Sequence, residues 1–532
     1  MDRKGAGDAS VGDLAVVRPG RGRARLERVL GPAAHIEAVL EGLLWHEGVR
    51  RRHPPLPALP PEDEPDRVDL RDLFAFTIDP DEAKDFDDAL SLRRDGEGDG
   101  VRAWVHIADV SAYLPAGAPL DGDAAERGFS TYVPGRVEPM LPDELSAGLC
   151  SLRPYEDRRC VTVEIPFGAG AVPGEATFYR SLIRSRERLT YGQAQAMLAG
   201  RERAEEELAA SLRLAQDLTE ALRRRRYERG ALRIETGEVA FAFDGQGGVE
   251  RAWIEGEPLA HMLVEELMIA ANEAVGALLA GRGREALYRV HERPEPQSVE
   301  LLLAKLAELE VPTPPVPDDL TPSDAARLAS RASAKVTGYA EQAGRGREAF
   351  PALVLRALKQ ARYDPRNLGH SGLASRAYCH FTSPIRRYPD LVCHRALLRE
   401  LGVLDVELPD DLPELAEWTS VRERDAAQLE YRADELCLAW LLERRLFETG
   451  WDAVFEGEII GAIASGIFVR FDGVFEGYVP VRRMPGDYFE LNPLGTALVG
   501  RRSGSAYRLG DPVRVRVEDV RRWEGKVELS LP

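Results

Sequence analysis

The sequence predicts an α+β fold with three parts: a small N-terminal module, a large central domain and a C-terminal barrel of five short strands. Three observations lead to this organisation. A proline-rich stretch at 53–61 interrupts the chain, strand-like and then long helical patterns fill the central region, and short strand-like runs recur towards the end. We expect a module at 1–54, a linker at 55–67, a central domain at 68–448 and a barrel at 449–532.

Composition and charge exclude several classes of protein. The 532 residues are 44% hydrophobic and 30% charged, which is typical of globular domains. The net charge of −19 argues against non-specific coating of nucleic acid but is compatible with a local basic channel. Five cysteines without a C-x-x-C pair exclude a disulfide framework and a thiolate zinc site. No apolar run could span a membrane and the first residues lack a signal-peptide core, so we expect a cytoplasmic protein without membrane contact.

The N-terminal module is predicted from a strand-like run around Val16 and Val17 and an amphipathic helix at 33–47. Between them lies a run of basic residues: Arg18, Arg21, Arg23, Arg25 and Arg28. Up to residue 54 there are 10 Lys and Arg against 7 Asp and Glu, opposite to the balance of the whole chain. This run fits either a nucleic-acid contact or an ordinary solvated face.

The central domain is expected to be a mixed sheet surrounded by helices. Apolar and polar residues alternate at 101–107, which is typical of a half-buried strand. Leucines at helical spacing predict helices at 204–229 and 414–447. After residue 450, five strand-like runs occur at 454–460, 466–471, 477–481, 512–517 and 527–531. That number of short strands in about 80 residues is typical of an OB-fold barrel.

The most informative stretch is acidic. Six acids lie between Asp79 and Asp88, and apolar residues that favour burial alternate with them. Crowded carboxylates resist joint ionisation, and a hard divalent cation such as Mg²⁺ or Mn²⁺ removes that penalty. The lack of a neighbouring histidine weakens a zinc interpretation. Hard metals held by several aspartates are typical of phosphodiester hydrolysis, although a solvated acidic loop is the commoner fate of such a run.

A second informative stretch is rich in arginine. Between residues 356 and 400 there are 9 Lys and Arg against 3 Asp and Glu. Arginine binds phosphate through paired hydrogen bonds, and the interleaved Tyr378, Phe381 and Tyr388 could stack on bases or simply pack. A buried network between arginine and Asp390 would give the same pattern.

Together these two stretches resemble the signatures of the ribonuclease II / ribonuclease R (RNB) exoribonucleases. The matching sequences are TIDPDEAKDFDDALS at 77–91 and HFTSPIRRYPDLVCHR at 380–395. Shorter motifs agree in order at 106–111, 140–142, 149–152, 188–191, 264–266 and 288–292. The resemblance covers about residues 68–445 and identifies that region as an RNB catalytic domain. The last part is similar to an S1 RNA-binding domain.

The resemblance implies processive hydrolysis of single-stranded RNA from a free 3′ end, releasing nucleoside 5′-monophosphates. It implies Mg²⁺, with Mn²⁺ as a substitute, and a monomer without an obligate protein partner. Carried over to this sequence, the metal-binding and catalytic acids are Asp79, Asp85, Asp87 and Asp88. Arg386 matches the arginine that stabilises charge on the scissile phosphate.

Further positions are candidate RNA contacts by the same resemblance. Tyr132 matches an aromatic residue that stacks on the terminal base. Tyr191 and Glu265 match positions that discriminate ribose from deoxyribose. Only ribose carries a 2′-hydroxyl, which can both donate and accept a hydrogen bond there. The remaining candidates are Arg289, Arg387, Tyr388 and Phe468.

The N-terminal module departs from the family pattern. Two cold-shock barrels of about 65–70 residues each do not fit into 54 residues, so we expect a partial barrel or a winged helix. Less protein at the channel mouth predicts wider access to structured RNA. An alternative function, an RNA-binding regulator with a degenerate nuclease domain, would be marked by loss of a metal acid, and all four are present. A DNA hydrolase is disfavoured by Tyr191 and Glu265.

Overall fold

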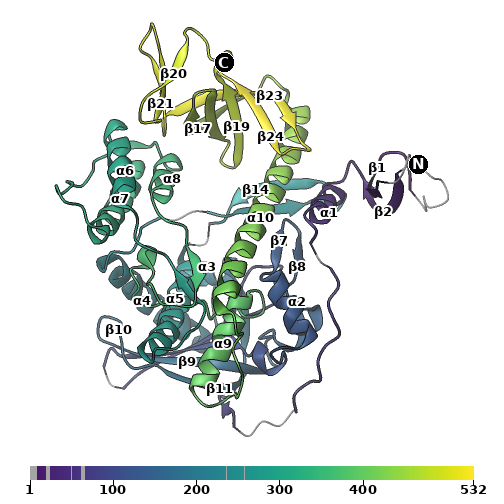
Figure 1. Cartoon of the computed structure of the whole chain (residues 1–532), viewed down its shortest axis with the longest axis vertical. Helices are drawn as coiled ribbons and strands as arrows, with labels where there is room; N and C mark the ends of the chain where they lie inside the picture. Colours follow the sequence, from purple (N-terminus) through teal and green to yellow (C-terminus); the bar gives the residue numbers. More distant parts are fainter. Residues whose placement is uncertain are drawn as a thin grey trace.

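The computed structural model describes residues 9–19, 24–49, 51–61, 66–96, 98–234, 237–256 and 258–532. Figure 1 shows a mixed α/β body with a small barrel at one end and a two-stranded hairpin projecting from its side. One long helix, α10 (Leu412–Thr449), runs from the body to the barrel. The predicted α+β fold with a C-terminal five-stranded barrel is confirmed. Arg21 and Arg23 of the N-terminal basic run lie outside the described residues.

The N-terminal part consists of β1 (Asp13–Arg18), β2 (Arg25–Pro32) and α1 (Ile36–His46). The two strands pair antiparallel, and α1 occupies the range where the apolar periodicity predicts a helix. Ile36 and Leu44 are fully buried and share one hydrophobic core with Val133 and Leu429 of the central region. Helix α1 therefore packs as part of the central body.

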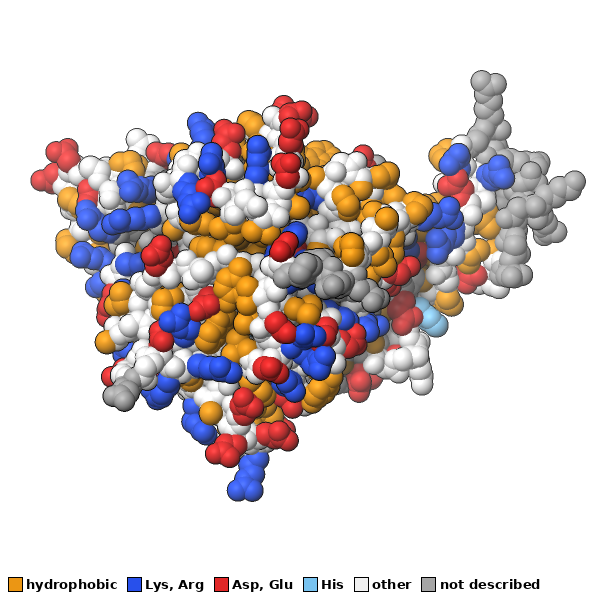
Figure 2. Space-filling model, turned by 90° about the horizontal axis from the view of Figure 1, so that it is seen from below, with side chains coloured by type: hydrophobic (Ala, Val, Ile, Leu, Met, Phe, Trp, Pro, Cys, Tyr) orange, Lys and Arg blue, Asp and Glu red, His pale blue; other side chains and the backbone are white. Residues whose placement is uncertain are grey.

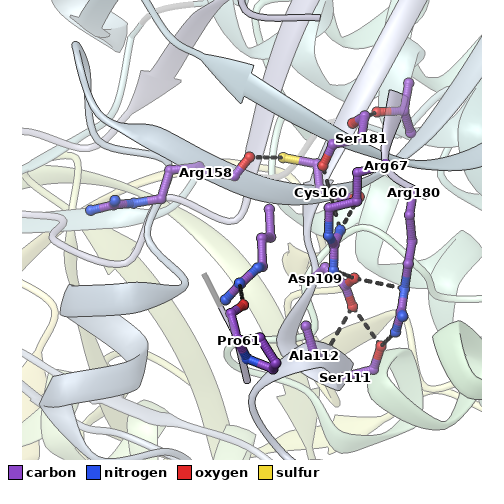
Figure 3. Close-up of polar contacts among 11 residues, drawn as sticks. Pro61, Arg67, Asp109, Ser111, Ala112, Arg158, Cys160, Arg180 and Ser181 are labelled. Atoms are coloured by element: carbon purple, nitrogen blue, oxygen red, sulfur yellow. Dashed lines mark hydrogen bonds and ion pairs between the residues drawn. The ribbon is translucent and has the colours of Figure 1, made fainter. Parts of the chain in front are cut away.

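The proline-rich connection holds residues 51–61 without helix or strand, as expected of an extended linker. Its end is anchored at Asp109, a fully buried carboxylate directly after β6 (Val101–Ala108). Arg67 Nη2 donates to Asp109 Oδ2 at 2.8 Å, and Arg180 Nε lies 3.0 Å from the same oxygen (Figure 3). Two guanidiniums compensate the buried charge, so the linker joins the sheet at a fixed point.

The central sheet has eight strands in the order β12-β4-β5-β6-β9-β11-β3, with β10 paired to β9. Besides β6, they are β3 (Val68–Asp69), β4 (Phe76–Asp79), β5 (Asp88–Arg94), β9 (Asp157–Gly168), β10 (Val172–Pro173), β11 (Thr177–Arg184) and β12 (Glu187–Thr190). The pairs β12–β4 and β11–β3 are parallel, and the others are antiparallel. The sheet is therefore mixed, as predicted.

Helices cover both faces of this sheet. One core contains α3 (Tyr191–Leu198), α4 (Glu206–Glu228) and α5 (Pro258–Gly281), and the other contains α2 (Pro119–Arg127), while α9 (Tyr388–Glu400) contributes residues to both. Successive side chains of a strand point to opposite faces of the sheet. Leu90 therefore belongs to the first core, and its neighbour Ala89 belongs to the second. Further elements are α6 (Pro296–Glu308), α7 (Pro322–Ala343), α8 (Ala349–Arg356) and the strand pairs β7–β8 (Thr131–Val133, Arg136–Glu138), β13–β14 (Val239–Phe243, Val249–Ile254) and β15–β16 (Tyr288–Val290, Arg362–Asp364).

The C-terminal barrel closes in the order β17-β18-β19-β24-β23. Its strands are β17 (Val454–Ile463), β18 (Gly466–Phe471), β19 (Phe475–Pro480), β23 (Pro512–Arg521) and β24 (Lys526–Ser530). A three-stranded sheet, β20 (Phe489–Leu491), β21 (Ala497–Gly500) and β22 (Ala506–Arg508), is inserted between β19 and β23. The sequence prediction missed this insertion because its strands are only three or four residues long.

The surface mixes both charges. Figure 2 shows acidic and basic side chains interspersed over the face seen from below, with hydrophobic side chains between them. This agrees with the negative net charge, which disfavours a broad attraction to nucleic acid. Among the described helices, none combines the length and the apolar character needed to cross a membrane.

Candidate active site

The acidic stretch lies at an edge of the sheet formed by two strand ends. Asp79 is the last residue of β4, and Asp88 is the first residue of β5. The loop between them is fixed from outside: the Ser151 hydroxyl donates to the Lys84 carbonyl at 2.7 Å and accepts the Phe86 amide at 3.1 Å. Strand pairing and this serine therefore fix the backbone that carries the carboxylates of Asp79, Asp87 and Asp88.

Two of these carboxylates are buried and incompletely satisfied. Asp79 and Asp87 are 8% and 4% exposed, and Oδ2 of each has no hydrogen-bond partner among the described residues. Burial, together with the charge of Asp88, raises the pKa of Asp79 to about 7. Burial likewise raises the pKa of Asp88 to about 6 and that of Asp87 well above its ordinary value. Such an arrangement favours a bound cation, which would stabilise the ionised forms.

The donor set fits a hard divalent cation that also takes ligands from its substrate. All the oxygen donors of the loop are carboxylates or carbonyls, and no histidine or cysteine adjoins them. Within the described ranges, no three acidic, histidine or cysteine side chains already converge on one point. Mg²⁺ commonly binds through one or two carboxylates plus substrate phosphates and water. Asp79 Oδ2, which lacks a hydrogen-bond partner among the described residues, and Asp87 Oδ2, which faces the Arg386 guanidinium at 3.3 Å, are suited to that mode of binding.

The arginine stretch meets the acids here. The Ile385 amide donates to Asp87 Oδ1 at 2.9 Å, and Arg386 Nε lies 3.3 Å from Asp87 Oδ2. Arg386 Nη2 also donates to Ser383 Oγ at 3.1 Å, while 45% of the Arg386 side chain stays exposed. The two stretches singled out in the sequence therefore form one site, with a guanidinium at its open side.

Tyr132 reaches the same site from β7. The Ser130 amide donates to the Arg386 carbonyl at 2.9 Å, which fixes the start of β7 beside the arginine segment. The Tyr132 hydroxyl donates to Asp85 Oδ2 at 3.1 Å, and its amide donates to Glu430 Oε1 at 2.7 Å. The ring is 37% exposed and can offer a face to a base. Sequence reasoning did not find Glu430, which lies on α10 outside the two stretches that the sequence singles out.

Tyr191 lies beside Asp79, and Glu265 lies on the neighbouring helix α5. Thr190 is the register partner of Asp79 in the parallel β12–β4 pair, so the next residue, Tyr191, starts α3 beside the acids. The Tyr191 ring stacks on His261 of α5 with 4.0 Å between ring centroids. Glu265 follows His261 by one helical turn, so both lie on one face of α5. Its carboxylate, half exposed, accepts from Arg226 at 3.1 Å.

The remaining predicted RNA contacts differ in accessibility. Arg289 is paired with Glu423 at 2.6 Å, and Arg387 binds both oxygens of buried Asp390 at 2.9 and 2.7 Å. Phe468 on β18 is 41% exposed. Tyr388 is corrected: its ring is 3% exposed and lies in the core, because its hydroxyl is bonded to buried Asp121 at 3.2 Å. It offers no face to a base.

A cavity of about 820 Å³ connects the site to the barrel. Tyr132 and Tyr191 lie at one end, residues of α10 form a wall, and Phe475 and Arg470 lie at the barrel end. The described lining contains more acidic than basic side chains: Asp81, Glu82, Glu238, Glu255, Glu430, Asp434, Glu435 and Glu476. Long-range attraction of phosphate is therefore weak inside this cavity, and aromatic stacking gains importance.

Comparison with known families decides the identity of this domain. The family model described as the RNB domain matches residues 67–402, and the S1 RNA binding domain matches residues 450–531. The chain belongs to the RNB family. The RNB match contains every acidic candidate and Arg386, and the S1 match contains the closed barrel.

Known relatives extend over most of this RNB chain. Ribonuclease R of Escherichia coli (strain K12) is 36% identical over 512 residues, which is 92% of this chain but 60% of the relative. The chain thus spans about 60% of that relative's length. Mycoplasma genitalium RNase R with ribose-methylated single-stranded RNA matches at a TM-score of 0.86 and 26% identity, covering 96% of this chain and 80% of the other. The structure of that RNase R with double-stranded RNA matches at a TM-score of 0.82 and 25% identity, covering 99% of this chain and 90% of the other.

Proposed function

We propose that this RNB protein is a hydrolytic 3′→5′ exoribonuclease that degrades single-stranded RNA to nucleoside 5′-monophosphates. The observation that carries the proposal is the contact of Arg386 with Asp87 at the edge of four aspartates, next to exposed Tyr132. An anionic phosphate placed there would meet a guanidinium and a cation site together. The relationship to ribonuclease R over 92% of this chain supports the same activity.

Each side chain has a role in this proposal. Asp79, Asp85, Asp87 and Asp88 would hold Mg²⁺, or Mn²⁺ in its place, which supplies charge neutralisation and activation of water when bound. Arg386 stabilises negative charge on the scissile phosphate, since its side chain is oriented by Ser383 and Asp87 but remains accessible. Tyr132 stacks on the 3′-terminal base.

Selection of RNA over DNA is assigned to Tyr191 and Glu265. A phenol donates and accepts, and a carboxylate accepts, so together they suit a 2′-hydroxyl. The placement of Tyr191 beside Asp79, and of Glu265 one helical turn after the His261 ring on which Tyr191 stacks, supports this role. We propose processive action, because RNA that fills the cavity between site and barrel contacts the protein over several nucleotides.

Access to structured RNA is part of the proposal. In the described residues, the N-terminal part contains one strand pair and one helix, and α1 packs on the central body. Solved structures of the Mycoplasma genitalium relative hold it in complex with ribose-methylated single-stranded RNA and with double-stranded RNA. We therefore expect the chain to start on a 3′ overhang and continue into a duplex.

The test is digestion of a 5′-labelled single-stranded RNA with Mg²⁺, beside Asp87→Asn and beside a DNA of the same sequence. Conversion of full-length RNA to a short end product, lost in Asp87→Asn and absent with DNA, supports the proposal. Few intermediates indicate processivity, and a full ladder indicates distributive action. A retarded RNA complex without digestion supports the RNA-binding regulator, and rapid digestion of DNA supports a less selective phosphodiesterase.

A further inference from the structure

We propose that Glu41, on the N-terminal helix α1, is a positioning residue that fixes the β7–β8 hairpin and through it the stacking face of Tyr132. The N-terminal part would then act as a support for the site that receives the RNA 3′ end. This inference rests on the proposed function and assigns part of it to a segment outside the RNB match. Figure 1 shows α1 next to β7 and β8.

A network of two buried acids, Glu41 and Glu138, with Arg51 and Arg136 joins α1 to the hairpin, and Arg28 of β2 lies 3.6 Å from Glu41 at its edge. Glu41 is 8% exposed and accepts from Arg51 Nη1 at 2.6 and 2.7 Å. Arg136 of β8 donates to the same carboxylate at 2.6 Å. Its other terminal nitrogen lies 2.5 Å from Glu138, which is 7% exposed and also faces Arg51 at 3.8 Å. Every charge in the group has an opposite charge beside it.

The hairpin depends on this support because it is very small. Strands β7 and β8 have three residues each, and among the described strands they pair with one another and with no third strand. A two-stranded hairpin of that size is not stable by itself in water. Outside the network, β7 is held by burial of Val133, by the contacts of Tyr132 with Glu430 and Asp85, and by the Ser130–Arg386 bond just before it. Loss of the network would remove the ion pairs that tie β8 to α1.

Register shows how the network acts on Tyr132. Thr131 faces Glu138 and Val133 faces Arg136, so these pairs share one face of the hairpin. Tyr132 faces Val137 and therefore projects from the opposite face, towards Asp85. The network holds the hairpin from one side, and the aromatic ring is presented on the other. A tilt of the hairpin about its axis would move the ring away from the site.

Among the residues of this network, Glu41 is the one whose loss most disturbs the balance of charges. Burial alone would raise the pKa of Glu41, but Arg51 and Arg136 outweigh this and hold it below the ordinary value. Removing the carboxylate charge leaves Arg51 and Arg136 facing Glu138 alone and takes a negative charge from beside Arg28, and such an unbalanced group rearranges towards water. Arg136, whose side chain is 42% exposed, has the easiest route outwards, and it carries β8 with it.

The experiment uses the full chain with EDTA, so that binding is measured without turnover. The probe is a single-stranded RNA whose 3′-terminal base is 2-aminopurine, which loses fluorescence when it stacks. The variants are Glu41→Gln, Arg136→Gln and Tyr132→Ala. Glu37→Gln is the matched control, because Glu37 is an exposed glutamate on the same helix. Thermal unfolding of every variant accompanies the titrations.

We expect wild type and Glu37→Gln to quench the probe equally. Glu41→Gln and Arg136→Gln should weaken quenching and raise the apparent Kd about fivefold to tenfold, within the range of one stacking contact. In a Tyr132→Ala background, Glu41→Gln should add nothing, because its effect passes through the ring. A general structural role would instead weaken binding in both backgrounds.

Each other outcome is decisive. The inference is overturned if Glu41→Gln quenches the probe as strongly as wild type, or if wild type does not quench it. It is also overturned if Glu41→Gln weakens binding as much in the Tyr132→Ala background as in wild type. If Glu41→Gln unfolds, Arg136→Gln decides in its place from the hairpin side. Failure of wild type to digest RNA with Mg²⁺ overturns the proposed function separately, since quenching in EDTA does not require hydrolysis.

Discussion

Arg386 Nε lies 3.3 Å from Asp87 Oδ2, although the two residues come from opposite ends of the RNB match. The neighbouring Ile385 amide bonds the second oxygen of the same carboxylate at 2.9 Å. A buried acid is thus tied to the backbone and to a half-exposed guanidinium at once. This contact aligns the two groups that the proposed reaction needs at the phosphate.

Asp87→Asn should abolish hydrolysis while preserving RNA binding. The amide can still accept from Ile385, but it cannot supply charge to a cation, so we expect a loss of about 1000-fold in rate. Stability should stay equal or rise, because the buried charge disappears. Single-turnover digestion, filter binding and thermal unfolding measure the three effects. Removal of Mg²⁺ by EDTA should reproduce the catalytic loss, and near-normal digestion by Asp87→Asn would refute the site.

Arg386→Lys should lower kcat roughly 100-fold to 1000-fold, the range for losing one electrostatic stabiliser. Lysine keeps the charge but not the planar donors that contact Asp87 and Ser383 together. We expect KM to change less than kcat. Arg366→Lys is the control, since Arg366 lies in the same basic segment with 72% of its side chain exposed. Equal kcat values for both variants would contradict the assignment.

Asp390→Ala should destabilise the chain by about 3–5 kcal/mol, because it leaves Arg387 buried without its carboxylate. Asp390 is fully buried, binds Arg387 through both oxygens and accepts the Ser383 amide at 2.8 Å. Urea unfolding measures the change. Asp425→Ala serves as the control, since Asp425 is half exposed and paired with Arg422 on one helix. We expect it to cost less than about 1 kcal/mol.

Asp434→Asn should stabilise the chain increasingly as pH rises from 5 to 8. Burial, with Glu430 and Glu238 nearby, raises the pKa of Asp434 to about 7. Its unfolded value is about 3.9, so between these values the unfolded state releases a proton that the folded state keeps. Wild-type stability therefore falls across this window, and the asparagine avoids that loss.

The measurement for Asp434 is the difference in Tm between Asp434→Asn and wild type at several pH values. We expect this Tm difference to grow by about 2–4 °C for each kcal/mol of wild-type destabilisation that the asparagine avoids. Asp452→Asn, at an exposed position after α10, should show no such trend. A Tm difference that is constant with pH would contradict the raised pKa of Asp434.

The parts of the site predicted from sequence are those encoded by local pattern. Acids clustered at 79–88 and arginines at 386–387 needed no knowledge of pairing, and the structure brings them together. Helices with strong apolar periodicity, such as α1 and α4, were also predictable. The burial of Tyr388 was predictable from the sequence, because Leu391, Val392 and Arg395 follow it at helical spacing and share its buried face.

Contacts between distant segments were beyond such reasoning. Glu430 sits in a helix with acids on several faces, and only the tertiary fold selects it for the Tyr132 amide. Glu41 likewise reads as an ordinary polar position of an amphipathic helix until Arg136 arrives from another segment. Short strands such as β7, β8 and β20 carry too few residues for a period to show.

Helix α10 spans 38 residues, carries Glu430 beside the site and is joined to the first barrel strand by the short connection 450–453. Each residue of an α-helix turns the chain by about 100° and advances it 1.5 Å. A single inserted residue between Glu430 and the barrel would therefore swing the barrel to another side of the molecule. Only insertions or deletions close to two whole turns, about seven residues, would keep the barrel on the same side of the helix axis. Evolution of this chain should thus tolerate substitutions along α10 far better than insertions or deletions.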